Sequence, residues 1–163
     1  MPVLITAGLS QEAYRVKRIL DKAEVVFADS SPLPQIPGTK SLVLPSYTSS
    51  SFVHEVLKAC LDLGIKKVYP LKSGEVRELA KARLLFAEYE VRLILPSDEW
   101  LRNNEMTAAP RDAAITVVEE GAAVAGADLP EPLSINKETG IFAWATRDQK
   151  TEYSLYLVED AGI

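Results

Sequence analysis

The chain carries two carboxylates and a lysine where a parallel sheet would place a ligand site. Asp29 ends one apolar run, and Glu75 follows another after the turn Lys72-Ser73-Gly74. Ligands of open parallel sheets bind outside the carboxyl ends of the strands, and acids in such clefts often have shifted pKa values. We therefore expect Asp29 and Glu75 to flank one cleft, with Lys72 between them. Helix capping and contact with solvent give a purely structural explanation of the same two acids.

The first turn of the chain contains part of a dinucleotide-binding fingerprint. Gly8 follows an apolar run, and Asp29 stands about twenty residues later, where such sites hold the ribose. The full fingerprint needs three glycines, but Gly8 is followed by Leu9-Ser10-Gln11-Glu12-Ala13. A leucine and a glutamate would occupy the space of the pyrophosphate. The sequence also has no phosphate-binding loop of the Gly-Lys-Ser type. We therefore expect no nicotinamide cofactor, and no other cofactor is evident.

Other reactive side chains lack the partners that catalysis or metal binding needs. His54 is the single histidine and has no cysteine pair near it, so carboxylates alone would have to complete a zinc site. The single Cys60 sits at an apolar helical position, where free cysteines usually pack in a core. Ser46 and Ser73 have no evident base and stand where turns and helix caps favour serine. We expect neither catalytic residues nor a metal site.

Length, composition and charge indicate a globular protein with one full core. Of the 163 residues, 47% are hydrophobic and 25% are charged, which leaves room for a small appended subdomain. The net charge of -5 disfavours nucleic acid and anionic membrane surfaces as partners. No apolar run approaches the ~20 residues of a membrane span, and Met1-Pro2 leads directly into a strand without signal-peptide features. We therefore expect a cytoplasmic protein.

The stretch from Val3 to Ser10 sets the pattern for the first two thirds of the chain. It is an apolar run, then a small residue and a glycine, then a serine that can cap a helix. The same pattern predicts strands at 24–29, 41–44, 67–71 and 91–95, and helices over 11–23, from 53 to the capping Gly64, from the capping Ser73 to 87, and around Trp100. Strands that alternate with helices through short loops form a parallel sheet. We predict an α/β fold with a Rossmann-like parallel sheet of about five strands and helices on both faces.

The last third of the chain has a different pattern. Short apolar runs predict strands at 114–118, 122–124, 132–135, 141–145 and 153–158, separated by polar turns. Strands this short, with so few residues between them, indicate a small antiparallel β meander. Residues 108–110 form the expected boundary, so we predict a Rossmann-like domain at 1–108 and a β-rich subdomain at 109–163.

We expect one ligand-binding cleft where the strands of the parallel sheet meet the following helices. Backbone N–H groups at helix N-termini would be available there for a carboxylate or a phosphate, which makes a small anionic metabolite the expected ligand. The expected cleft residues are Gly8, Ser10, Asp29, Ser30, Ser46, Tyr47, Lys72, Ser73 and Glu75.

Six short motifs follow one another through the first 106 residues. They are Leu4-Ile5-Thr6-Ala7-Gly8, Val26-Phe27-Ala28-Asp29-Ser30, Leu44-Pro45-Ser46-Tyr47, Val68-Tyr69-Pro70-Leu71, the helical run from Glu78 to Phe86, and Arg92-Leu93-Ile94-Leu95-Pro96-Ser97. In their order and spacing they resemble the N-terminal domain that precedes the ATP-grasp domain in carbamoyl-phosphate-synthetase-like and related carboxylate-amine ligases. The resemblance covers residues 3 to about 106.

The resemblance implies an active site shared between two domains. In that family the N-terminal domain forms the substrate side, and the ATP-grasp domain supplies the ligands of ATP and magnesium. An ATP-grasp domain takes far more residues than remain after Met106. Where the family has Asn-Asp-Lys, this chain has Asn103-Asn104-Glu105-Met106, and Ser134 stands in place of the carboxylate of the Glu-x-Asn magnesium element. We therefore do not expect ATP-dependent ligation by this chain alone.

Three hypotheses of function follow. The first is a non-catalytic domain that binds a small molecule or a partner and is related to the N-terminal domain of ATP-grasp ligases. The second is one subunit of a split ATP-dependent carboxylate-amine ligase, which would use ATP and magnesium held by a separate ATP-grasp subunit. The third is a homodimeric structural or interaction protein that pairs through its C-terminal strands, where Trp144, Tyr153 and Tyr156 look exposed in the sequence.

Overall fold

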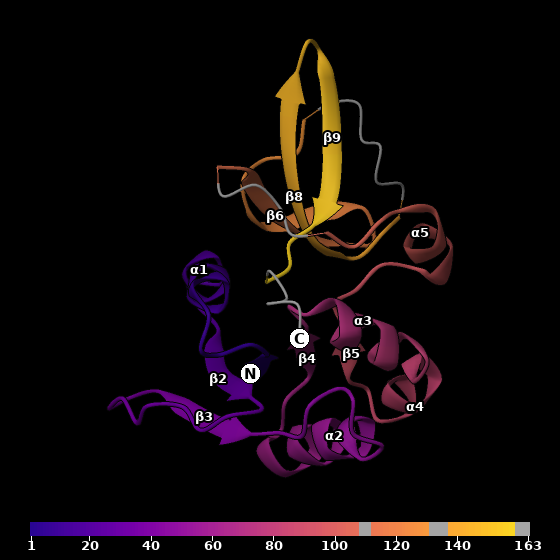
Figure 1. The fold of residues 1–163 in the computed structure, drawn as a ribbon. Helices are drawn as coiled ribbons and strands as arrows, with labels where there is room; N and C mark the ends of the chain where they lie inside the picture. The colour runs from indigo at the N-terminus through magenta and orange to yellow at the C-terminus, as the bar shows by residue number, and fades with distance from the viewer. Residues whose placement is uncertain (108–111, 131–136, 159–163) are drawn as a thin grey trace.

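The computed structural model describes residues 1–107, 112–130 and 137–158, and it contains the predicted parallel sheet. The five strands lie in the order β3-β2-β1-β4-β5 (Figure 1). Their bounds are Pro2–Ile5 (β1), Glu24–Asp29 (β2), Lys40–Val43 (β3), Lys67–Tyr69 (β4) and Arg92–Leu93 (β5). The chain runs outward from β1 to β3 and then crosses to the other side of β1 for β4. The strand order therefore reverses between β1 and β4, which is where open α/β sheets bind their ligands.

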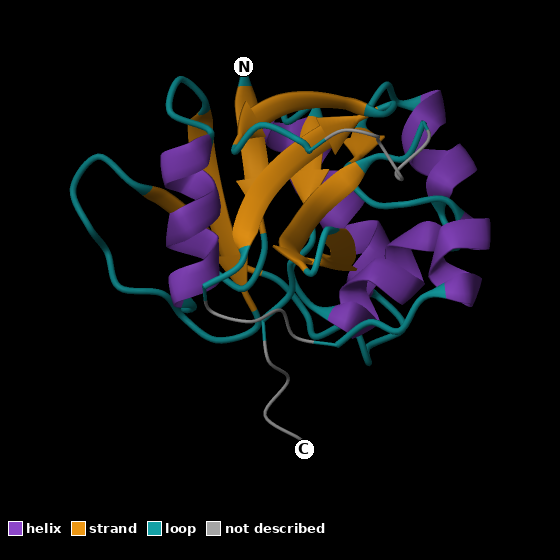
Figure 2. Cartoon of the chain, turned by 90° about the horizontal axis from the view of Figure 1, so that it is seen from above, coloured by secondary structure: helices purple, strands orange, loops and turns teal. Residues whose placement is uncertain are grey.

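Helices cover both faces of the sheet, as predicted. They are Gln11–Ile19 (α1), Phe52–Leu63 (α2), Ser73–Ala80 (α3), Arg83–Glu88 (α4) and Asp98–Asn103 (α5). The face that carries Leu4 and Val26 packs against α2, α3 and α4 through buried side chains such as Val56 and Phe86. The opposite face packs against α1, and Figure 2 shows the strands at the centre with helices at both sides.

The last third of the described chain is an antiparallel sheet, also as predicted. Its strands Ala114–Glu119 (β6), Ala122–Gly126 (β7), Gly140–Arg147 (β8) and Lys150–Leu155 (β9) lie in the order β7-β6-β8-β9. The predicted meander order is wrong, because β8 pairs with β6 and not with the preceding strand β7. Two-residue turns at Glu120-Gly121 and Asp148-Gln149 close the hairpins, and all four residues have positive φ, as the turn type that matches strand twist requires. Figure 1 shows the β8–β9 hairpin extending away from the parallel sheet.

The two sheets share one apolar core. Val117 and Ile141 of the antiparallel sheet belong to the same buried cluster as Val3 and Ile5 of the parallel sheet and Val16 of α1. The antiparallel sheet therefore lies beside α1, over the face of the parallel sheet that a single helix leaves uncovered.

Ion pairs add a polar connection between the two sheets. Glu119 of β6 accepts from Lys67 of β4 at 2.9 Å and from Arg92 of β5 at 3.0 Å.

The predicted helix over 73–87 is wrong, because the chain forms two helices there. One continuous helix would place Arg83 between Leu79 and Phe86 on the buried stripe. The break at Lys81-Ala82 leaves Arg83 half-buried, and its guanidinium donates to the carbonyl of Pro96 and to Asp98. A buried arginine without a partner would cost far more than the interrupted helix.

Smaller corrections concern element ends. Helix α1 ends at Ile19 rather than at residue 23, because the chain turns there to start β2 at Glu24. Lys72, not Ser73, occupies the N-cap position of α3. The expected strand 132–135 and the expected boundary 108–110 both lie wholly outside the described residues.

The aromatic side chains of the last strands are not exposed. Trp144 and Tyr153 are half-buried, and Tyr156 is buried with the guanidinium of Arg15 5.7 Å from its ring centre. The indole N–H of Trp144 donates to Thr116 within the antiparallel sheet. These contacts lie within the chain, so the aromatic residues give no support to pairing between copies. Among the described residues, no helix has the length and apolar character needed to cross a bilayer.

The shared core predicts that a cavity in the parallel sheet destabilises the antiparallel sheet as well. Ile5→Ala should lower the free energy of unfolding by about 2–5 kcal/mol, since Ile5 is fully buried. Trp100 and Trp144 both lie outside the parallel sheet. In urea unfolding of Ile5→Ala, the midpoint from their fluorescence should fall together with the midpoint from circular dichroism. Leu84 is 83% exposed, so the control Leu84→Ala should change the free energy of unfolding by under about 0.5 kcal/mol. An unchanged fluorescence midpoint in Ile5→Ala would contradict the shared core.

Candidate functional site

The hydroxyl of Thr6 connects three elements at the carboxyl edge of the parallel sheet. Thr6 directly follows β1, and its Oγ1 accepts from the backbone N–H of Leu71, after β4, at 2.8 Å. The same hydroxyl donates to Oε1 of Glu75 in α3 at 2.7 Å. Both bonds are buried, so Thr6 fixes the distance between β1, β4 and α3 where the strand order reverses. Thr6 was not among the predicted cleft residues, although a threonine at the end of an apolar strand was a usable signal.

Glu75 is a buried acid with a strongly shifted pKa. The residue is 8% exposed. Burial raises the pKa of Glu75 from 4.5 to about 7, against the lowering effects of the Thr6 hydrogen bond and the Lys72 charge. The charge of Asp29 also raises this pKa. Near neutral pH the carboxyl group can therefore exist in either protonation state, which the sequence alone did not indicate.

Glu75 also has a structural role at the start of α3. Its carboxylate accepts a hydrogen bond from the backbone N–H of Lys72, the N-cap residue. This is one half of a capping box, because Lys72 has no side-chain oxygen to return a bond to the first turn. The first backbone N–H groups of α3 therefore receive no side-chain cap, and they remain suited to an anion.

Asp29 connects the end of β2 to the first turn of the chain. Its Oδ2 accepts from the backbone N–H of Leu9 at 3.1 Å, and its Oδ1 accepts from the backbone N–H of Ser30 at 2.7 Å. Lys72 Nζ lies 3.8 Å from the same Oδ1 and makes only a loose ion pair. Asp29, Lys72 and Glu75 therefore meet at one edge, as the sequence analysis expected.

A small cavity lies between these charged groups and the end of β3. Its volume is about 10 Å³, which is barely room for one water molecule. Six of the nine predicted cleft residues line it: Asp29, Ser30, Ser46, Tyr47, Lys72 and Glu75. The ring of Tyr47 lies directly against Gly74, where any side chain would clash with it. Tyr47 therefore restricts access to the first turn of α3.

The other three predicted residues do not line this cavity. A Cβ at Gly8 would lie 2.5 Å from Leu33 and 2.9 Å from Phe27, so close packing accounts for this glycine. Ser10 caps α1, accepting from the N–H of Ala13 at 3.1 Å. Ser73 is the first residue of α3.

Other reactive groups lie apart from this edge. His54 is exposed on α2. Cys60 is buried, and burial raises the pKa of its thiol to about 12, which leaves it unreactive near neutral pH. Within the described ranges, no three histidine, cysteine, aspartate or glutamate side chains are grouped so that they could hold a metal ion.

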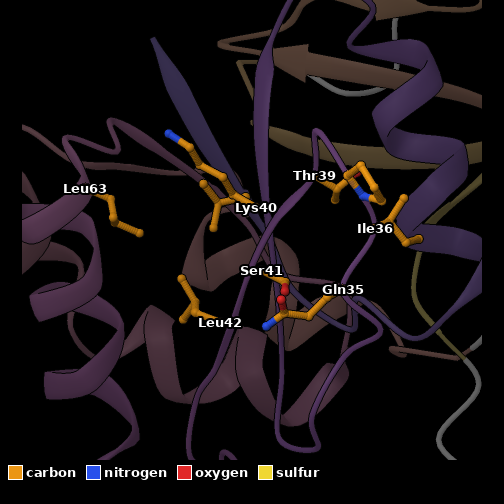
Figure 3. Close-up of a pocket in the computed structure, with 9 residues that line it drawn as sticks. Gln35, Ile36, Thr39, Lys40, Ser41, Leu42 and Leu63 are labelled. Atoms are coloured by element: carbon orange, nitrogen blue, oxygen red, sulfur yellow. The ribbon is translucent and has the colours of Figure 1, made fainter.

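A larger hollow of about 550 Å³ runs along the outer edge of β3. Figure 3 shows Leu42 and Leu63 on one side of it and Ile36 and Thr39 on the other. None of the predicted cleft residues lines this hollow. The short strand β3 begins at Lys40 and lies between Pro37 and Pro45, features that protect sheet edges from pairing. We therefore place the candidate site at the carboxyl edge and not here.

The raised pKa of Glu75 predicts a pH-dependent stability. The folded state favours the protonated form of Glu75. This preference adds fully to the free energy of unfolding below about pH 4.5, and the contribution is lost as the pH rises through 7. Relative to Glu75→Gln, the wild type should lose up to about 3 kcal/mol of unfolding free energy between these limits. Urea unfolding at pH 4.5 and 7.5 measures this difference. Parallel pH profiles for the two proteins would show that Glu75 has an ordinary pKa.

The chain is similar to parts of several solved structures. No family model and no curated protein matches the sequence. A single-chain, multi-domain long-chain acyl-CoA carboxylase is 13% identical with a TM-score of 0.48, and the match covers 94% of this chain and 22% of that one. Urea carboxylase from Kluyveromyces lactis is 10% identical with a TM-score of 0.48, covering 99% and 20%. Glycinamide-RNase-transformylase T from Mycobacterium tuberculosis is 11% identical with a TM-score of 0.49, covering 98% and 70%. This chain spans about a fifth of the two carboxylases, and the matches assign no activity to it.

Proposed function

We propose that this chain is a non-catalytic binding domain, related to the N-terminal domain of ATP-grasp ligases, that takes a small anionic metabolite at the carboxyl edge of its parallel sheet. The observation that carries the proposal is the meeting of Lys72, the uncapped first turn of α3 and the buried Glu75 beside the point where the strand order reverses. Three of the motifs that resemble the ligase family, those that end at Gly8, Ser30 and Leu71, end at the same edge.

Lys72 is the group best placed to hold the anion. Its side chain is 28% exposed, and it faces an aspartate whose two oxygens already accept backbone hydrogen bonds. Because the Lys72–Asp29 separation is 3.8 Å, little attraction is lost when the ammonium group turns to a ligand. The backbone N–H groups at the start of α3 would bind a second oxygen of the same carboxylate or phosphate.

Ligand entry needs a movement of Tyr47. The cavity admits only about one water, and the Tyr47 ring covers Gly74. When the ring turns away, the first turn of α3 becomes accessible. Protonated Glu75 could then donate a hydrogen bond to the ligand, so binding should be favoured when this acid is neutral.

We propose binding without chemistry because the buried hydroxyl at this edge already has its hydrogen-bond partners. Thr6 is 1% exposed and already bonded to Leu71 and Glu75, so its oxygen cannot approach a substrate. Among the described residues, no hydrogen bond joins the serines that line the cavity to a histidine or lysine that could act as a base.

Lys72→Ala should abolish ligand binding while leaving the fold intact. The measurement is the thermal midpoint in the presence of succinate, L-glutamate, inorganic phosphate or MgATP. A bound acid at a hundred times its Kd would stabilise the wild type by about 2.7 kcal/mol. The matched control is Lys81→Ala at the other end of α3, where the lysine is exposed and should have no effect on binding. A response that survives Lys72→Ala would remove this lysine from the site, and a response to MgATP alone would favour the split-ligase hypothesis.

A further inference from the structure

A second hollow opens at the amino-terminal edge of the parallel sheet, opposite the site proposed above. It has a volume of about 500 Å³, within the range of small-molecule sites. The starts of β1 and β4, the end of α1 and the β6–β7 hairpin surround it. It shares no lining residue with the cavity beside Lys72.

One wall of this hollow is apolar although it faces solvent. Strand β7 consists only of alanine, valine and glycine, and two of its residues line the hollow: Val124, which is 51% exposed, and the half-buried Ala125. Ile19 and Leu20 at the end of α1 continue the apolar surface into the hollow. Edge strands usually carry a charge or a proline that prevents unwanted contacts, and β7 has neither. This wall is therefore suited to an apolar ligand body.

The charges at the hollow favour a negative ligand head. Three lysines, Lys22, Lys66 and Lys67, line it together with Asp21 and Glu119. Both oxygens of Glu119 are occupied, by Lys67 at 2.9 Å and by Arg92 at 3.0 Å, so this acid is neutralised by its neighbours. Lys22 and Lys66 form no ion pair with the described residues. The residues around the hollow therefore carry a net positive charge, although the net charge of the whole chain is -5.

We infer that this hollow binds a small amphipathic anion, an alkyl chain ended by a carboxylate, with the chain against β7 and the carboxylate toward Lys22 and Lys66. Apolar contact would supply most of the affinity, and the two lysines would set the direction of the ligand. The inference is independent of the site beside Lys72, since the two lie at opposite edges of the sheet.

Titration of the ¹⁵N-labelled protein with hexanoate, octanoate and decanoate tests this inference. Amide shifts should concentrate at Ala23, Lys66 and Val124, and the Kd should fall about fourfold for each added methylene group. Octan-1-ol, with an octyl chain and no charge, should bind more weakly than octanoate. No saturable binding, or shifts that concentrate at Lys72 and Glu75 instead, would overturn the inference.

Matched variants separate this site from general affinity for fatty acids. Val124→Asp places a charge on the apolar wall at a residue that is 51% exposed, and it should raise the Kd for decanoate at least tenfold. Leu84→Asp, at an exposed leucine outside the hollow, should leave that Kd unchanged. The double change of Lys22 and Lys66 to alanine should remove the preference for octanoate over octan-1-ol, whereas Lys58→Ala on α2 should keep it. Equal Kd values in Val124→Asp and the wild type would refute the site.

Discussion

The Thr6 hydroxyl is the contact on which the carboxyl edge depends. A parallel sheet holds its strands together by backbone bonds, but these end before the turns begin, and β1 and β4 lead to helices on opposite faces. Thr6 continues the connection past the last backbone pair by bonding Leu71 and Glu75 at once. Because both partners are buried, loss of the hydroxyl would leave unsatisfied polar groups in a low-dielectric interior. Through these two bonds Thr6 holds Glu75 and Leu71 at this edge, and Lys72 directly follows Leu71 in the chain.

The second constraint is the uneven cover of the sheet. Three helices pack on one face, whereas α1 alone serves the other and leaves apolar side chains of β1 and β4 uncovered. The antiparallel sheet supplies the missing layer, and its hairpin β6–β7 reaches the amino-terminal edge, where Glu119 joins the lysine and arginine of β4 and β5. One packing requirement thus accounts for both the shared core and the hollow at that edge.

Local sequence predicted most of the elements and few of their contacts. Uninterrupted apolar runs predicted the buried strands, and the polar residues between the short strands of the last third predicted turns. The break at Ala82 was not predicted because the apolar stripe of the helix continues through it. Only the packing of the folded chain shows that Arg83 would be buried in one continuous helix. Gly8 suggested a ligand, but Leu33 and Phe27 pack against it. Of the cleft, the residues after β2, β3 and β4 were predictable from strand ends, whereas the Thr6–Glu75 bond joins residues that sequence spacing cannot relate.

The packing of the last strands has a consequence for how the chain emerges from the ribosome. The backbone N–H of Val158 bonds the carbonyl of Leu71 at 2.7 Å, and Ile141 and Tyr156 close the apolar face above β1. Synthesis proceeds from the N-terminus, so the parallel sheet is made while that face still lacks its cover. The nascent chain must keep Val3, Ile5 and Phe27 from water or from other chains until those last residues arrive. Translation pauses or chaperones that act on the first hundred residues would therefore affect the yield of folded protein more than those that act on the final hairpin.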